Sequence, residues 1–185
     1  MKTVVKILKY TLSAIGVVLL ILHFVPNTGF TKVWSYLATI LLPFVIDIVR
    51  LTGVKVSKQF ELCYLIFLIP AMILGIDFDI YKVFYPLDKI AHGFSGVLSA
   101  FGAKEILDQA SAKPDEKWFK ILWTIAFVGF VAMLWECFEF ACDQIGGTSM
   151  QQLIAPGISD TMYDMIVAMI GGIIGTILIF GRRTK

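Results

Sequence analysis

The stretch from Asp88 to Leu107, DKIAHGFSGVLSAFGAKEIL, combines two features that seldom occur together. Its middle is apolar and rich in small residues, as in helices that pack closely inside a membrane. Its first turns, however, carry Asp88, Lys89 and His92. A charged side chain costs about 2.5–3.5 kcal/mol at the centre of a membrane helix and less near its end. The stretch therefore predicts a membrane helix that begins in a polar site.

The composition of the whole chain is that of a membrane protein. Of its 185 residues, 58% are hydrophobic and 16% are charged, and the mean hydropathy is +0.82. A soluble domain has about half apolar and a quarter charged residues. The apolar residues form blocks of about 18–22 residues, the length that a helix needs to cross a bilayer. We predict an all-α polytopic protein, one transmembrane domain over residues 1–185, with six helices at about 4–25, 33–50, 59–76, 88–107, 118–141 and 161–180.

The basic residues predict the orientation of these helices. Lys and Arg are enriched in cytoplasmic loops. If the N-terminus is cytoplasmic, only Lys32, Lys82 and Lys89 of the 16 basic residues lie on the outer side. We therefore expect both termini in the cytoplasm. No basic run is interleaved with aromatic residues, so nucleic acid is not expected as a partner, whereas membrane lipids are.

In this topology, acidic residues of three helices come to the same level. Helix 88–107 runs inwards from its charged start, the next helix runs outwards into WECFEFACD, and the last begins with SDTMYDM. Residues three or four positions apart share a helix face, and a membrane helix turns such a polar face away from lipid. We therefore expect one pocket near the outer surface, formed by Asp88, His92, Glu136, Glu139, Asp160 and Asp164.

These residue types favour a cation site. Neighbouring carboxylates cannot all stay ionised unless a cation compensates them, and carboxylates with a histidine suit a divalent ion such as Zn²⁺, Mn²⁺ or Mg²⁺. Such an ion activates water near neutral pH, and a free carboxylate accepts the proton. The sequence predicts Asp88, His92, Asp160 and Asp164 as metal ligands and Glu136 or Glu139 as the general base.

Simpler roles exist for some of the acidic residues. Asp88 and Asp160 could cap their helices, where the helix dipole favours negative charge. Capping does not account for the four ionisable residues inside helices, His92, Glu136, Glu139 and Asp164. Near the opposite helix ends we expect interfacial charges at Asp47, Glu61 and Glu105.

Rows of small residues predict which helices touch. Gly171 and Gly175 form a G-x-x-x-G pair in helix 161–180, and small residues four apart let two helix backbones approach closely. Helix 88–107 has a comparable row at Ser95, Ser99 and Ala103. We expect these two helices to pack together, with helix 118–141 completing the pocket.

The connection over residues 143–159 has no basic residue. Thr148 and Gln151 form a capping pattern before a short apolar piece. We expect this connection to lie over the pocket, either as a short lid helix or as a packed loop.

In order along the chain, YPLDKIAHGFSGVLSAFGAKEIL, LWECFEF and SDTMYDMIVAMIGGIIG resemble the YjdF-like family of bacterial inner-membrane proteins, a domain of unknown function. The similarity extends from about Glu61 to Gly175 and implies a bacterial plasma membrane location. Gly157 stands where these proteins often carry an aspartate. The chain is more distantly similar to VanZ-like proteins, linked to glycopeptide-antibiotic resistance, which implies proximity to envelope lipids or lipid-linked precursors. The family pattern implies functional roles for Asp88, His92, Glu105, Glu136, Glu139, Asp160, Asp164 and Gly171.

Three functions are consistent with the sequence. The first is a metal-dependent hydrolase or transferase that acts on a lipid or a cell-envelope precursor. The second is a proton- or cation-coupled transporter, although carriers usually have polar groups near the membrane midplane and repeated halves. In this chain the middle of the helices holds only Ser and Thr as polar residues. The third is a non-catalytic module that binds a lipid or a partner protein.

Overall fold

A computed structural model describes residues 1–24, 32–110, 116–147, 151 and 158–181, and the regular structure within these ranges is helical. This confirms the all-α prediction. The expected helices begin within about two residues of their predicted positions, whereas the fifth helix ends five residues beyond its predicted end. The long helices are α1 (Lys2–Phe24), α4 (Lys58–Leu68), α6 (Pro86–Leu107), α7 (Lys117–Gly146) and α8 (Ser159–Phe180).

Prolines interrupt two of the predicted helices. The predicted helix 33–50 is divided into α2 (Val33–Leu41) and α3 (Val45–Leu51) by a 3₁₀ turn, η1 (Leu42–Phe44), which contains Pro43. The predicted helix 59–76 is α4 followed by a π-helix, η2 (Ile69–Asp77), which contains Pro70. Proline has no N–H to donate and its ring crowds the preceding turn, so the hydrogen-bond pattern changes there.

A short helix that the sequence did not predict, α5 (Ile80–Val83), leads into α6. The Tyr81 ring packs on Gly75, where a Cβ would lie 2.2 Å from the ring. The Tyr81 hydroxyl also donates a hydrogen bond to the Ala71 carbonyl oxygen over 3.0 Å. These contacts fix the start of α6 against η2.

Glycines bring α6 and α8 into backbone contact. A Cβ at Gly96 would lie 1.9 Å from the Ala168 carbonyl oxygen, and one at Gly171 would lie 1.9 Å from the Gly93 carbonyl oxygen. A Cβ at Gly175 would lie 2.8 Å from Ala100 Cβ. The two helices therefore run parallel and touch, as expected from the G-x-x-x-G pair.

The serine row on α6 does not make this contact. Ser95 and Ser99 line a cavity on the other side of the helix. The expectation that they pack against α8 was wrong because glycine, with no Cβ, allows a closer approach than serine does.

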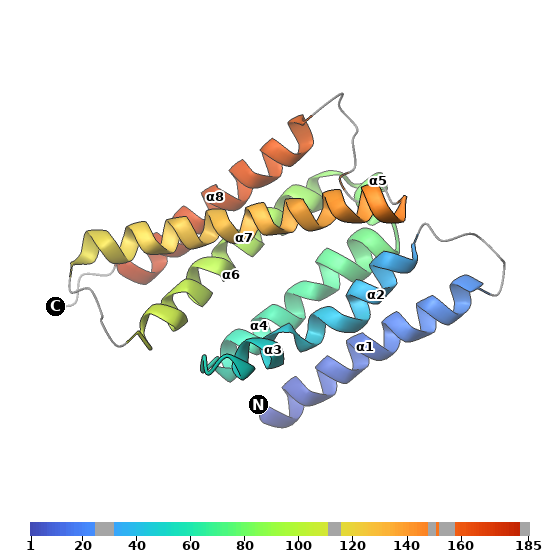
Figure 1. Cartoon of the computed structure of the whole chain (residues 1–185), viewed down its shortest axis with the longest axis horizontal. Helices are drawn as coiled ribbons and strands as arrows, with labels where there is room; N and C mark the ends of the chain where they lie inside the picture. The colour runs from blue at the N-terminus through green and yellow to red at the C-terminus, as the bar shows by residue number, and fades with distance from the viewer. Residues whose placement is uncertain (25–31, 111–115, 148–150, 152–157, 182–185) are drawn as a thin grey trace.

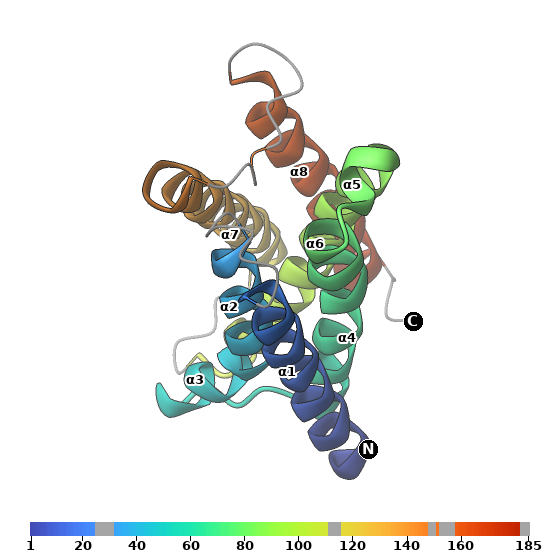
Figure 2. The same ribbon diagram turned by 90° about the vertical axis from the view of Figure 1, so that its right-hand side faces the viewer.

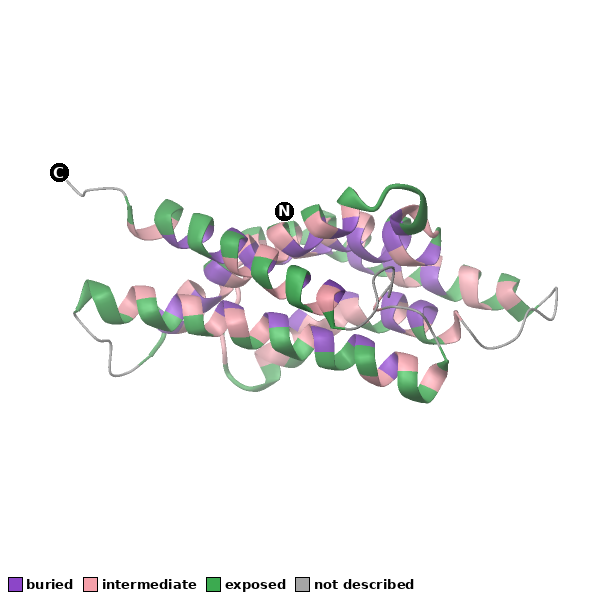
Figure 3. Cartoon of the chain, turned by 90° about the horizontal axis from the view of Figure 1, so that it is seen from above, coloured by how far each residue is buried: buried purple, intermediate pink, exposed green. Residues whose placement is uncertain are grey.

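The helices form two groups joined through α6. Figure 1 shows α7 and α8 on one side of the molecule and α1 on the other, and Figure 2 shows α6 between α8 and α4. Buried residues follow the inward faces of the helices (Figure 3). Large apolar side chains point outwards on the long helices, among them Ile7, Ile90, Phe140 and Ile177. Such an apolar exterior suits a lipid environment.

Five helical segments are long and apolar enough to cross a membrane: Lys2–Phe24, Val33–Leu51, Lys58–Asp77, Lys117–Gly146 and Ser159–Phe180. The helix α6 has 22 residues, but the polar residues near its two ends make it less apolar than these five. The described residues thus contain five candidate membrane spans and one further helix of similar length.

Candidate functional site

Three ionisable side chains from α6 and α8 converge at one end of the bundle. His92 Nε2 lies 3.7 Å from Asp88 Oδ1 and 3.7 Å from Asp164 Oδ1. One ligand atom from each residue lies within 4.8 Å of the others, and all three residues are buried. The helix spacing and the α6–α8 contact produce this arrangement together, because Asp88 and His92 share the face that Asp164 meets.

Lys89 lies at the centre of the surrounding carboxylates. Its ammonium group is 2.6 Å from Asp164 Oδ1, 2.7 Å from Asp160 Oδ1 and 3.0 Å from Asp88 Oδ2. It also lies 4.8 Å from the centre of the Tyr85 ring, within the range of a cation–π contact. From the sequence, Lys89 is expected to be the one positive charge of the pocket, but its contacts with Asp160 and Asp164 are not predicted. The glycines between α6 and α8 allow the two helices to touch. This contact brings the Lys89 side chain within reach of Asp160 and Asp164.

Tyr85, just before α6, completes the contacts of Asp160. Its hydroxyl donates a hydrogen bond to Asp160 Oδ1 over 3.0 Å. Partial burial, together with the nearby Asp160 carboxylate, raises the pKa of Tyr85 above its usual value, so the hydroxyl stays a donor. Asp160 is thus held by Lys89 and Tyr85, and it lies outside the three-residue group of possible ligands.

The two glutamates of α7 face the same region but differ in their contacts. Glu136 Oε1 lies 4.0 Å from His92 Nδ1, and Glu136 Oε2 is buried with no hydrogen-bond partner among the described residues. Glu139 accepts a hydrogen bond from the Trp135 indole over 2.6 Å. Glu136 therefore has an oxygen available to a ligand, whereas Glu139 is held in place. We call the whole set the Lys89 cluster: Asp88, Lys89, His92, Glu136, Glu139, Asp160 and Asp164.

The geometry of Asp88, His92 and Asp164 fits a metal ion. An ion about 2.0–2.2 Å from each ligand can join two ligand atoms up to about 4.4 Å apart, and the distances from His92 to the two carboxylates are 3.7 Å. One imidazole with two carboxylates suits Zn²⁺ or Mn²⁺ better than Mg²⁺, which prefers oxygen ligands and water. Lys89 competes for the same oxygen of Asp164, so an ion would have to displace or share that contact.

The capping role considered for Asp88 and Asp160 is wrong. The N-cap positions of α6 and α8 are Tyr85 and Ile158, and neither makes a side-chain capping bond. Both aspartates bind Lys89 instead. Glu105, which the family resemblance included, lies at the opposite end of α6 and accepts a hydrogen bond from the Ser57 N–H over 3.0 Å.

The connection expected over the pocket is described only in part. Asp143, at the end of α7, accepts a hydrogen bond from the Gln151 N–H over 3.1 Å. Residues 148–150 and 152–157 lie outside the described residues, so the expected lid helix stays a prediction.

A second ionic group lies at the other end of the bundle. The Glu61 side chain is fully buried, and its carboxylate pairs with Lys9 over 2.7 Å, Arg50 over 2.6 Å and Lys58 over 2.7 Å. The expectation that Glu61 is an interfacial charge was wrong, because basic side chains from α1, α3 and α4 surround it. We call this set, with Asp47 bound to Lys9 and Arg50, the Glu61 cluster.

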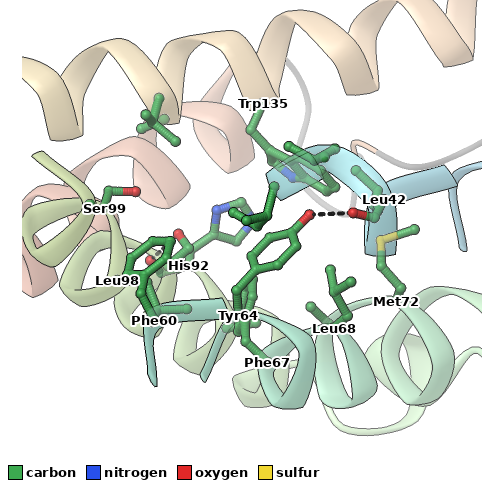
Figure 4. A pocket seen from close by; sticks show the side chains of 18 of the residues that line it. Leu42, Phe60, Tyr64, Phe67, Leu68, Met72, His92, Leu98, Ser99 and Trp135 are labelled. Carbon is green, nitrogen blue, oxygen red and sulfur yellow. Dashed lines mark hydrogen bonds between the residues drawn. The ribbon is translucent and has the colours of Figure 1, made fainter. Parts of the chain in front are cut away.

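An apolar cavity adjoins the Lys89 cluster. It has a volume of about 360 Å³ and lies between α3, α4 and η2 on one side and α6 and α7 on the other. Figure 4 shows the His92 imidazole and the Trp135 ring at this cavity, with aromatic and aliphatic side chains from α4 and η2 facing them. Asp88 and Glu139 also border it. The cluster is therefore accessible from an apolar space inside the bundle.

Comparison with known proteins places the chain in a family without assigning an activity. A family model described as "Predicted membrane protein (DUF2238)" matches residues 7–185. No curated protein and no solved structure shows significant similarity to the chain. The chain thus belongs to this family of predicted membrane proteins, in agreement with its resemblance to YjdF-like proteins.

Proposed function

We propose that this member of the DUF2238 family is a six-span membrane enzyme, a metal-dependent hydrolase or transferase that acts on a lipid or lipid-linked envelope precursor. One observation carries the proposal: Asp88, His92 and Asp164 converge, buried, within 4.8 Å of one another at the border of an apolar cavity. A metal-ligand set beside a space suited to hydrocarbon favours chemistry on a lipid.

The packing of α6 supports a sixth span. Its 22 residues extend over about 33 Å at 1.5 Å per residue, close to the hydrocarbon thickness of about 30 Å. Its polar first turns face α7 and α8 rather than lipid. With six spans, both termini lie on one side. The distribution of basic residues then favours a cytoplasmic location for the termini and an extracytoplasmic position for the Lys89 cluster, in a bacterial plasma membrane.

Each member of the Lys89 cluster has a distinct role in this proposal. Asp88, His92 and Asp164 would hold Zn²⁺ or Mn²⁺, which acts as a Lewis acid on a phosphoryl or acyl oxygen when bound. Glu136, whose Oε2 has no hydrogen-bond partner in the described part of the chain, would accept the proton of the attacking hydroxyl group or water.

The remaining members position these groups. Lys89 holds Asp160 and Asp164 in place. Glu139, which accepts a hydrogen bond from Trp135, would hold the Trp135 ring in place rather than transfer a proton.

A transporter has less support. No ionisable residue occurs between His92 and Lys104 on α6, between Lys120 and Glu136 on α7, or after Asp164 on α8 until Arg182. A coupled carrier needs charged or polar groups near the midplane, where both sides can reach them. A non-catalytic binding module would need neither the metal nor a proton acceptor.

The metal content of the purified chain tests the ligand assignment. The full-length protein in detergent is incubated with Zn²⁺ or Mn²⁺, dialysed and analysed by elemental mass spectrometry. We expect about one ion per chain in the wild type, and loss of this ion in His92→Ala and Asp164→Asn. Asp143→Asn, which removes an acid of α7 outside the cluster, is the matched control and should keep the ion. Equal metal content in all four proteins would refute the site.

Turnover of lipids tests the chemistry. Metal-loaded protein is incubated with a bacterial lipid extract, and the lipids and released head groups are analysed by mass spectrometry. We expect the wild type to convert a component that Glu136→Gln leaves intact while still binding metal. A bound ion with no converted component in either protein would favour the non-catalytic module.

A further inference from the structure

The cavity beside the Lys89 cluster is polar at its ends and apolar between them. Asp88, His92 and Glu139 border one end, and Glu105 borders the other. Between them the walls are aliphatic and aromatic, with Phe60 and Phe67 from α4 among them (Figure 4). This distribution of polarity matches an amphiphile better than a water-soluble molecule.

The polar atoms along the middle of the cavity are mostly bonded within the protein. The Tyr64 hydroxyl donates to the Leu42 carbonyl oxygen over 2.9 Å, and the Ser95 hydroxyl donates to the His92 carbonyl oxygen over 2.7 Å. The Trp135 indole donates to Glu139. A buried water needs two to four polar partners. The middle of the cavity therefore offers little to water and favours hydrocarbon.

The cavity is long as well as apolar. Asp88 and Glu105 both line it and are 17 positions apart on the single helix α6. At a rise of about 1.5 Å per residue, these positions are about 25 Å apart, most of the hydrocarbon thickness of a bilayer, about 30 Å. A volume of about 360 Å³ spread over such a length is narrow, which suits one flexible chain rather than a compact ring system.

We propose that this cavity binds one hydrocarbon tail of a membrane lipid and presents the lipid head to the Lys89 cluster. The inference rests on the proposed function in taking that cluster as the reactive site, and it makes the substrate a lipid rather than a soluble precursor. The tail lies between α4 and α6–α7, and the head meets His92 and Glu136 at the polar end.

Photo-crosslinking locates the tail. The full chain is reconstituted in vesicles of phosphatidylethanolamine and phosphatidylglycerol that contain a phosphatidylcholine with a diazirine on one acyl chain. After illumination, labelled residues are mapped by mass spectrometry. We expect labels on the outward residues Ile170 and Ile174, as for any membrane helix, and a second set inside the cavity at Phe67 and Leu98.

Variants with a filled cavity test whether the labels at cavity residues come from a lipid tail bound there. Ser99→Phe places a ring in the cavity from α6, and Val131→Phe does so from α7, so the second variant serves if the first does not fold. We expect both to lose the cavity labels and to keep the outward labels. Thr11→Phe adds the same ring on an exposed position of α1 and should change neither set. Labels confined to outward residues in the wild type, or cavity labels that survive both filled variants, would overturn the inference.

The metal measurement separates this inference from the proposed function. Ser99→Phe should keep its bound ion, because its side chain lies about two helical turns from His92. A wild type that carries cavity labels but no metal would refute the enzyme and leave the lipid site. A wild type that binds metal but carries no cavity labels would refute the lipid site alone.

Discussion

The two ionic clusters of the molecule have opposite compositions. The Glu61 cluster places three basic side chains, Lys9, Arg50 and Lys58, around two carboxylates. The Lys89 cluster places one ammonium group among five carboxylates and a histidine. Both oxygens of Glu61 are in ion pairs, whereas Glu136 Oε2 has neither an ion pair nor a hydrogen bond with the described residues.

The difference supports the proposal that the Glu61 cluster stabilises the fold and that the Lys89 cluster binds a ligand. A buried charge is tolerated when opposite charges surround it, and Glu61 meets that condition with side chains from three helices. The Lys89 cluster does not, because its carboxylates outnumber its one fixed cation. A surplus of buried acid is costly unless a cation or a proton joins it. The Glu61 cluster joins three helices through ion pairs, whereas the composition of the Lys89 cluster supports the proposal that it binds a cation.

The largest effect on stability should come from Glu61→Gln. The substitution removes the fully buried carboxylate and leaves three basic groups with the half-exposed Asp47 alone, and breaking a buried ionic network costs about 3–5 kcal/mol. Thermal or denaturant unfolding in detergent measures the loss. Glu105→Gln removes an acid at the same end whose carboxylate accepts one hydrogen bond from the described residues, that of the Ser57 N–H, and it should cost about 1 kcal/mol. Equal losses of stability in the two variants would show that the Glu61 cluster stabilises the protein no more than a single hydrogen bond does.

Lys89→Met should destabilise the protein less than Glu61→Gln does, and added metal ions should restore the lost stability. The carboxylates that lose their ammonium group can take up a proton, which limits the cost to about 1–3 kcal/mol. Zn²⁺ or Mn²⁺ should restore the unfolding temperature of this variant, because the competitor for Asp164 is gone. A ligand at 100 times its dissociation constant adds about 2.7 kcal/mol.

Lys58→Met is the matched control for that experiment. It removes one of three cations from Glu61 and leaves Lys9 and Arg50 in place, so we expect a small loss of stability and no effect of metal. Restoration of Lys58→Met by the same ions would show that the effect of metal is not specific to the Lys89 cluster.

Glu136→Gln should change stability by less than about 1 kcal/mol, because Glu136 Oε2 has no hydrogen bond to the described residues that the substitution could remove. The protein should keep its metal, since Asp88, His92 and Asp164 are untouched. Unfolding curves and metal analysis of the same preparation measure both properties. A loss as large as that of Glu61→Gln would mean that Glu136 serves stability, and that the two clusters do not differ in kind.

The sequence predicted the helices well because apolarity over about 20 residues is a local property. The convergence of Asp88, His92 and Asp164 also followed from local spacing, once the topology placed the helix ends at one level. The roles of Lys89 and Glu61 did not follow, because two of the three partners of each lie on other helices. The π-helix η2, which contains Pro70, and the cavity between α4 and α7 depend on contacts between segments that are far apart in the sequence. No single segment encodes these contacts.

The smallest effect should come from a half-buried ion pair near the surface that belongs to neither cluster. Asp79, between η2 and α5, pairs with Lys32 and with Lys82. Partial burial alone would raise its pKa, but the two lysines outweigh it and hold the pKa of Asp79 below its usual value. A carboxylate with a lowered pKa stabilises the folded protein above the unfolded pKa, and this contribution is lost as pH falls through the folded pKa.

Asp79→Asn tests that contribution and, with it, the importance of burial. Asp79 has a positive φ of 58°, which asparagine also tolerates, so the substitution changes charge rather than backbone. Because ion pairs at the surface contribute about 0–1 kcal/mol, we expect a difference of that size at pH 7 that begins to fall near pH 4, the unfolded pKa, and is lost as pH falls through the lower folded pKa. Unfolding of both proteins across this pH range measures it. A difference as large as that of Glu61→Gln would mean that the number of opposite charges, and not burial, makes the Glu61 cluster stabilising.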